Sequence, residues 1–370
     1  MRIVPTTRRT HTSTIAFTGD IAFSGYFTGK YQPEILDKEI IRFLSESDYT
    51  VANIEAPVTD QTDDKRFHHS SPLASLPFFR TINANIWNLG NNHILDFGIE
   101  GLKDTFFAAN QIHAQTIGVG SSDKPNAPLI LGDNEIALIS VTYTRQSAGH
   151  KGSDFSTFWW KEKGLANIIA DAKRSCRWCI VISHCGDEFS PIPMPYVRKR
   201  YHKYLNYGAD LVIGHHPHVV QNYETVGNKL IVYSLGNFVF DTDYQRIQNH
   251  SDLGMLVRIN LSQSGYQMEH MAIRIDRESS AIQTCEDIPV FTDISNQLYR
   301  KYWPLAAKQL ELNQIKKQHA LRNTSAVKDV IKHFTHLRHP YGRAIFWGDI
   351  REKAIRYRKE DNIYRFLTES

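Results

Sequence analysis

The feature that most constrains this fold is an alternation of strand-like and helix-like runs along the 370-residue chain. The runs at 14–20 and 49–57 are short and apolar, and they close with Gly-Asp and with Pro, as strands often do. The run at 33–47 instead places its apolar residues at helical spacing behind an early proline. Such alternation is typical of α/β domains whose strands are largely buried. We therefore predict an α/β fold.

Two regions are expected. Further strands are predicted at 85–93, 115–120, 135–143, 179–188, 210–218, 230–241, 254–261 and 267–275, and further helices at 98–112, 164–175 and 195–208. From about residue 290 the pattern changes to helices without strands, including 325–337, and the last residues are rich in Arg and Lys. We predict a main domain at 13–288 and a basic helical extension at 289–370.

Composition excludes several protein classes. Hydrophobic residues make up 41% and charged residues 22% of the chain, and the net charge of +4 is too small to indicate a nucleic-acid partner. No apolar run is long enough to predict a membrane-spanning helix, and we expect no signal peptide. Cys176 and Cys179 form a lone CxxC that runs into an apolar strand, so buried thiols are favoured over redox or metal roles.

Polar side chains gather where the expected strands end. They are Asp20, Asn53 with Glu55, Asn91 to His93, His184, His216 with His218, and Asn237 with Asp241. Ligands of open α/β sheets bind outside the carboxyl ends of the strands, so we expect these loops to converge on one site. Imidazole, carboxylate and amide oxygen suit one or two divalent ions, Mn, Fe, Zn or Mg, better than a thiolate-bound metal.

Two short segments carry the most chemistry. In "GHHPHVV" (214–220), His216 and His218 lie two apart, so on an extended segment both would face one ion or two adjacent ions. An ordinary loop rich in histidine remains the alternative. In "GNNHILD" (90–96), Asn92 can offer an amide oxygen to a metal and His93 can act as a general acid. Asp96 would orient that imidazole if the segment turns as a helix does. We assign substrate binding to Asn53, Glu188 and Asn237.

Six segments resemble the CapA family of poly-gamma-glutamate biosynthesis, which is similar to the calcineurin-like metallophosphoesterases. They are "FTGD" (17–20), "ANIEAPV" (52–58), "LGNNHILDFG" (89–98), "ISHCGDEFSPIP" (182–193), "GADLVIGHHPHVVQ" (208–221) and "YSLGNFVFD" (233–241). The resemblance covers roughly residues 13 to 275. It implies a four-layer α/β/β/α sandwich with a metal site at the strand ends.

The resemblance also implies roles for individual residues. Five residues match metal-ligand positions of the phosphoesterase pattern: Asp20, Asn92, His184, His216 and His218. Glu55 stands near the position of the carboxylate that bridges two metals in that pattern. His93 matches the position of its general acid, and Asp96 matches the carboxylate that orients this acid. The pattern has a histidine two residues after Asp20, whereas Ile21 and Ala22 stand here. This departure bears on whether the site holds two ions.

Three functions are weighed on these grounds. The first is a metal-dependent hydrolase of the phosphoesterase type, acting on a phosphoester or on an amide or ester linkage of an acidic polymer. The second is a non-catalytic, metal-containing component that binds an acidic polymer during its synthesis or export. The third is association with a membrane surface or a protein partner through 289–370. We expect a cytoplasmic protein, either free or peripheral to the membrane.

Overall fold

The computed structural model describes residues 13–63, 68–121, 126–133, 135–143, 155–158, 164–286, 288 and 290–294. All of them belong to one compact unit, Met1–Leu310. The predicted helix at 325–337 and the basic tail lie outside the described residues. The described segment 290–294 packs on the main domain, where Phe291 contacts Tyr223 with ring centroids 5.2 Å apart. No described helix is long and apolar enough to cross a membrane.

The first sheet has eight strands. Its strand order is β16-β15-β14-β1-β2-β3-β4, and β13 pairs with β1 beyond this path. The strands are β1 (Ser13–Gly25), β2 (Tyr49–Ile54), β3 (Ile86–Asn88), β4 (Gln115–Ile117), β13 (Asn237–Asp241), β14 (Leu253–Leu261), β15 (Tyr266–Asp276) and β16 (Ala281–Thr284). The pairs of β1 with β2, β2 with β3 and β3 with β4 are parallel, so the ends of these strands meet at one edge.

The second sheet has six strands in the order β11-β12-β10-β9-β7-β6. They are β6 (Leu129–Leu131), β7 (Ile136–Thr142), β9 (Trp178–His184), β10 (Leu211–His215), β11 (Tyr223–Val226) and β12 (Lys229–Val232). Strands β7, β9, β10 and β12 run parallel and are buried along almost their whole length. A separate two-stranded sheet pairs β5 (Gly120–Ser121) with β8 (Phe155–Ser156).

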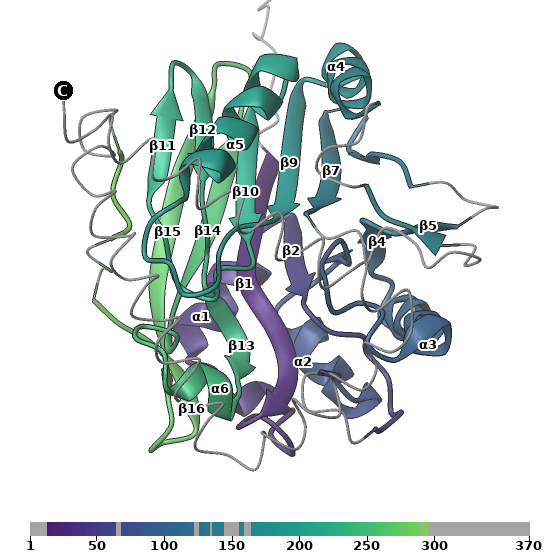
Figure 1. Ribbon diagram of the computed structural model, residues 1–370, viewed down its shortest axis with the longest axis vertical. Coiled ribbons are helices and arrows are strands. Elements are labelled where there is room, and N and C mark those ends of the chain that lie inside the picture. The colour runs from purple at the N-terminus through teal and green to yellow at the C-terminus, as the bar shows by residue number, and fades with distance from the viewer. Residues whose placement is uncertain are drawn as a thin grey trace, which may run out of the picture. The chain divides into compact units, whose positions relative to one another are not determined.

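Helices cover the outer faces of the two main sheets. The α-helices are α1 (Lys38–Ser45), α2 (Leu76–Thr81), α3 (Gly98–Gln111), α4 (Leu165–Ser175), α5 (Pro195–Tyr207) and α6 (Asp243–Arg246), with 3-10 turns η1 (Pro33–Ile35) and η2 (Leu73–Ser75). One core cluster joins the first sheet to α1, α2 and α3, and another joins the second sheet to α4 and α5. A third cluster lies between the sheets. Figure 1 shows α5 in front of β10 and β12, and β13 beside β1.

The α/β prediction is confirmed, and each predicted run within the described residues contains a helix or strand. The short elements α2, α6, β6, β8, β11 and β16 were not predicted. Two predictions were wrong in ways that matter for the site. The run at 230–241 is two strands, because β12 belongs to the second sheet and β13 to the first. The run at 14–20 does not end at Asp20, since β1 continues to Gly25 by pairing with a new neighbour. Local periodicity cannot reveal such a change of partner.

Candidate metal centre

Asp20 lies inside β1 at the point where this strand changes its hydrogen-bonding pattern. It is paired with Asn53 of β2 on one side and with Asn237 of β13 on the other, and a register shift falls beside it in both pairings. The carboxylate is completely buried. The prediction that Asp20 follows the end of a strand is therefore corrected: a register shift, rather than a strand end, places it at the centre.

The close approach of β1 to β13 depends on Gly19. A Cβ atom on Gly19 would lie 2.4 Å from the carbonyl oxygen of Gly236. Gly236 itself has φ of 67°, which favours glycine. The amide of Asp20 donates a 3.0 Å hydrogen bond to that same carbonyl. Glycine at these two positions thus lets the segment between β12 and β13 cross from one sheet to the other beside Asp20.

The second sheet contributes histidines from two neighbouring strand ends. His184 and His215 are the last residues of β9 and β10, and they are paired in register. The chain beyond His215 is not extended, because His216 has φ of 95° and His218 has φ of 57°. The predicted extended pair was therefore wrong. Pro217 fixes the residue between them, and Gly186 makes room for that ring, since a Cβ there would lie 3.0 Å from Pro217 Cγ.

The left-handed backbone at His216 and His218 directs the two rings to different partners. Glu55, His184 and His216 have ligand atoms that lie within 4.8 Å of one another and form a first cluster. The Nε2 atom of His184 is 3.2 Å from His216 Nδ1 and 3.3 Å from Glu55 Oε1. Asn92 Oδ1 approaches the same Nε2 atom to 2.8 Å. Four donor atoms from four segments of chain therefore meet at one point.

A second cluster consists of Asp20, Glu55 and His218. His218 Nδ1 lies 3.1 Å from Asp20 Oδ2, and its Nε2 lies 4.0 Å from Glu55 Oε1. Glu55 belongs to both clusters, because it stands directly after β2 between the histidines and Asp20. The structure therefore brings together all six residues proposed as metal ligands, in two groups that share one carboxylate.

Buried amides hold the carboxylates in place. The Nδ2 group of Asn53 donates to Asp20 Oδ1 at 2.7 Å and to Glu55 Oε2 at 3.3 Å. Its Oδ1 atom accepts a 2.6 Å hydrogen bond from Asn88 Nδ2. Asn237 Oδ1 lies 3.0 Å from His218 Nδ1, and Asn237 Nδ2 donates to a backbone carbonyl. Both ends of the Asn53 amide and of the Asn237 amide are thus engaged inside the protein.

The two carboxylates differ in their affinity for protons. Burial acts to raise the pKa of Asp20, but hydrogen bonds from His215 and His218 outweigh burial and hold that pKa well below its usual range. Burial, together with the charge of Asp20, raises the pKa of Glu55 to about 8. Without a cation, the site therefore carries one buried carboxylate and one buried carboxylic acid at neutral pH.

The histidines also differ in charge. Burial lowers the pKa of His184 and of His216 well below the usual value, so both rings are neutral ligands at physiological pH. Burial acts to lower the pKa of His218 as well, but its hydrogen bond with Asp20 prevails and raises that pKa to about 9. Neutral imidazoles in the first cluster leave lone pairs available to a metal.

The donor set fits a divalent ion. Nitrogen and oxygen ligands 2.0–2.2 Å from one tetrahedral ion lie roughly 3.3–3.5 Å apart, close to the spacings around His184. Glu55 Oε1 and His184 Nδ1 are buried, and among the described residues neither has a well-formed hydrogen bond. A buried carboxylate oxygen without a hydrogen bond is costly unless a cation satisfies it. Glu55 Oε1 faces both clusters and could meet that need in either.

His93 lies beside the ligands, where the chain turns. Its Nδ1 atom is 2.8 Å from Asp96 Oδ2, and the amide of Asp96 donates to the His93 carbonyl at 2.9 Å. The predicted contact between these two side chains is therefore confirmed. Burial acts to lower the pKa of His93, but the hydrogen bond and charge of Asp96 prevail and raise it. The ring can thus hold a proton near neutral pH.

His69 completes this acid–base group. Its amide donates to the same Asp96 Oδ2 atom at 2.9 Å, and its ring lies 4.9 Å from both His93 and Phe240. Burial lowers the pKa of His69 to about 3, so its ring stays neutral beside His93. The amino-acid sequence gives His69 no role, because nothing in the order of the chain indicates that residues 69 and 93 meet.

Aromatic rings surround the histidine cluster. Tyr143 packs against His216 with centroids 4.9 Å apart, and Phe189 and Phe240 pack against His218 at 5.9 and 5.4 Å. Glu188 is half-buried at this rim and accepts a 3.3 Å hydrogen bond from the Tyr244 hydroxyl. Glu188 therefore lies at the edge of the site, whereas Asn53 and Asn237, the other two residues predicted to bind substrate, are completely buried.

Two supporting residues were missed from the sequence. His215 Nδ1 lies 3.2 Å from Asp20 Oδ1, and Asn88 supports Asn53. A signal existed for Asn88, because a polar amide in an otherwise apolar strand run requires a buried partner. For His215 the signal was ambiguous, since neighbouring histidines on either side of a strand end face different ways.

Comparisons with known proteins agree with these motifs. The family model described as bacterial capsule synthesis protein PGA_cap matches residues 14–242. A PGA biosynthesis protein CapA of Bacillus subtilis is 29% identical over 262 residues, which cover 68% of each chain. A capsule biosynthesis protein CapA of Bacillus anthracis is 26% identical over 272 residues, which cover 68% of this chain and 64% of the relative. The chain thus spans about two thirds of the length of these relatives.

Solved structures are matched more distantly. A 5'-nucleotidase from Candida albicans is 11% identical with a TM-score of 0.42, covering 82% of this chain and 58% of that chain. A hypothetical protein from Thermus thermophilus is 12% identical with the same TM-score, covering 70% of this chain and 98% of that chain. Similarity at this level carries no functional argument.

The family model spans more than half of the chain and all six motifs that carried the resemblance. Those motifs supply the side chains that the two sheets bring together around Glu55. This chain belongs to the bacterial capsule synthesis protein PGA_cap family.

Proposed function

We propose that this protein is a metal-dependent hydrolase of the phosphoesterase type that acts in the synthesis of a capsule or another exopolymer. Its substrate is a phosphoester, or an amide or ester linkage in an acidic polymer. One observation carries the proposal: the buried Glu55 carboxylate is shared by two groups of metal donors, and its Oε1 atom has no well-formed hydrogen bond among the described residues. The names of the CapA relatives support the link to capsule synthesis.

One or two divalent ions would be held by the two clusters. Asn92, His184 and His216 would bind on one side of Glu55, with Asp20 and His218 on the other. All the donors are nitrogen or oxygen, which suits Mn, Fe, Zn or Mg. An ion held there supplies Lewis-acid chemistry that stabilises developing negative charge.

His93 is the proton donor in this proposal. Its Nδ1 is engaged by Asp96, so the proton on its Nε2 is the one available to a leaving oxygen. Asp96 fixes the orientation of the ring, and it is fixed in turn by the amide of His69. The neutral ring of His69 packs against His93 without competing for the same proton.

Asn53 and Asn237 have positioning roles in this proposal rather than the substrate-binding roles predicted from the sequence. Each is completely buried, and each uses both ends of its amide inside the protein. Glu188, at the rim, remains the candidate for substrate contact. Its carboxylate can accept hydrogen bonds from amide or hydroxyl groups of a bound polymer.

The three core clusters support a four-layer α/β/β/α sandwich for residues 13–288, with helices outside each of the two sheets. We propose a cytoplasmic protein whose residues 289–370 bind a membrane surface or a protein partner. Sedimentation with anionic liposomes tests the membrane part, because equal pelleting with and without residues 295–370 would refute it.

A second function has one observation in its favour. Ala22 stands where the phosphoesterase pattern has a further histidine, and it is packed in an apolar cluster with Ala56 and Phe240. The second cluster is thus one ligand short. A metal held for structure or for gripping an acidic polymer would make the protein a non-catalytic component of polymer assembly.

Elemental mass spectrometry and turnover assays distinguish these functions. We expect one or two equivalents of metal in the wild type and loss of metal in His216→Ala/His218→Ala. His93→Gln should retain the metal and lose most turnover of a panel of phosphoesters and glutamyl amides. Exposed His250→Ala is the matched control.

The outcomes separate the two functions clearly. Undiminished turnover in His93→Gln would refute the proton-donor assignment. Metal without turnover in the wild type, with polymer binding, would support the assembly component. Wild-type protein that retains no metal after incubation with an excess of each candidate ion would refute both functions.

A further inference from the structure

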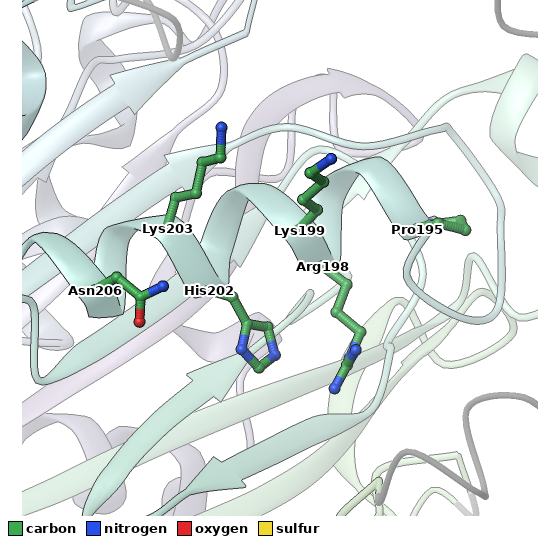
Figure 2. Close-up of a pocket in the computed structure, with 6 residues that line it drawn as sticks. All are labelled: Pro195, Arg198, Lys199, His202, Lys203 and Asn206. Atoms are coloured by element: carbon green, nitrogen blue, oxygen red, sulfur yellow. The ribbon is translucent and has the colours of Figure 1, made fainter. Parts of the chain in front are cut away.

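The outer face of α5 carries an unusual set of charges. This helix, Pro195–Tyr207, contains Arg198, Lys199, Arg200, His202 and Lys203 and no acidic residue. Lys199 and Lys203 are exposed and, among the described residues, neither forms an ion pair. Figure 2 shows both lysines projecting from the same side of the helix.

These charges oppose the stability of the helix that carries them. Lys199 and Lys203 are like-charged neighbours four residues apart, which repel one another on a helix. Arg198, Lys199 and Arg200 also lie in the amino-terminal half, where the helix dipole disfavours cations, and the first turn has no acid to compensate. Residues that break local rules in this way are expected where function requires them.

The same face is hollowed. A cavity of about 420 Å³ is lined by Pro195, Arg198, Lys199, His202, Lys203 and Asn206. Two of these lining residues contact the buried carboxylate of Glu224, which accepts hydrogen bonds from Arg198 at 2.6 and 3.0 Å and lies 3.1 Å from His202. Arg198 and His202 are therefore anchored in place, while the two lysines remain available to a ligand.

The helix begins beside the candidate metal centre. The loop after His184 leads directly into α5, and the Tyr196 hydroxyl donates a 2.8 Å hydrogen bond to Asp187 in that loop. Lys203 lies about 10 Å further along the helix axis than Tyr196, at 1.5 Å per residue. A chain lying along α5 would thus have one end at the rim of the metal centre.

We propose that the basic face of α5 is a docking surface for an acidic polymer with repeated carboxylates, and that it guides this polymer to the metal centre. This proposal rests on the proposed function for the identity of the reacting site. Cations spread over about one and a half helical turns match a chain of negative charges better than a single small anion. Among the residues that line the cavity, only Pro195 is apolar and only His202, whose ring is held by Glu224, is aromatic, so a membrane and a nucleic acid are less well matched.

Binding of fluorescent poly-gamma-glutamate of defined length tests the surface on the full chain. Lys199→Glu/Lys203→Glu should weaken binding by at least about tenfold and reduce its dependence on salt, because two attractions become two repulsions. The matched control is Lys38→Glu/Arg42→Glu, which reverses two exposed cations with the same spacing on α1. The control should change affinity by less than about twofold.

The result that would overturn the proposal is equal affinity in wild type, α5 variant and control. Single-stranded DNA or phosphatidylglycerol vesicles that bind as tightly, and that are released by the same α5 changes, would overturn the assignment to a polycarboxylate. Circular dichroism and the milder Lys199→Gln/Lys203→Gln variant guard against a folding defect.

The metal-site variant His216→Ala/His218→Ala distinguishes this proposal from the function it rests on. Polymer binding that survives in that variant and is lost in the α5 variant supports the docking surface, whether or not the wild type shows turnover. Binding that is lost only in the metal-site variant would overturn the docking surface and leave the hydrolase proposal intact.

Discussion

Replacing Glu55 with glutamine should stabilise the metal-free protein at neutral pH. The Glu55 carboxyl is completely buried next to Asp20, and these two causes raise its pKa from 4.5 to about 8. At pH 7 the folded protein therefore holds a proton on Glu55, whereas the unfolded chain does not. Glutamine has nearly the shape of the protonated carboxyl and binds no proton. Position 55 of the Glu55→Gln protein therefore takes up no proton on folding.

The size of the effect follows from linkage. A folded-state pKa above the unfolded value means that stability falls as pH rises from 4.5 towards 8. At about 1.4 kcal/mol per pH unit, the penalty reaches about 3 kcal/mol at pH 7. The advantage of Glu55→Gln should thus be near zero at pH 4.5, grow to this value at pH 7, and level off above pH 8.

Chemical denaturation in the presence of a chelator, at pH 4.5, 6, 7 and 8, measures this advantage. Exposed Glu39→Gln is the control and should show no such trend. The same Glu55→Gln protein should bind metal far more weakly, because the shared ligand loses its charge. A variant that is less stable than wild type at pH 7 would show that the carboxyl is already ionised in the metal-free fold, and would refute the reasoning.

Three further predictions concern the support of the site and of α5. Asn53→Ala should cost roughly 3 kcal/mol in urea denaturation, because two carboxylates and the Asn88 amide lose a buried partner. Gly19→Ala should cost at least about 2 kcal/mol and reduce metal content, since its Cβ would lie 2.4 Å from the Gly236 carbonyl oxygen. Hydrogen bonds from its neighbours outweigh burial and lower the pKa of Glu224 to about 2, so its stabilisation is present above pH 4.5 and lost as pH falls towards 2. Glu224→Gln should therefore be less stable than wild type at pH 7 but not at pH 2 in denaturation experiments.

The sequence was informative where the signal is local. The hydrogen bond between His93 and Asp96 spans three residues and follows from the chemistry of one turn. The gathering of side chains at strand ends followed from a general property of parallel sheets. The pairing of Asp20 with Asn237 could not be predicted, because it depends on β13 leaving the sheet of β12 to join β1. Registers between distant strands are set by packing of the whole domain, which periodicity does not record.

The loop "HHPH" brings two proposed ligands into the site with a backbone geometry other than the predicted one. Two histidines on an extended segment would face the same way and serve the same ion. Here His216 and His218 adopt left-handed backbone, a conformation that costs on the order of 1–3 kcal/mol for each residue that has a side chain. The cost separates the two rings, so that His216 joins His184 in one cluster and His218 joins Asp20 in the other, and Glu55 belongs to both clusters. Strain of this kind persists only where the surrounding structure fixes it, as Gly186 and Pro217 do here. The loop is therefore built to present two imidazoles to two places, which favours a two-ion centre over a single ion.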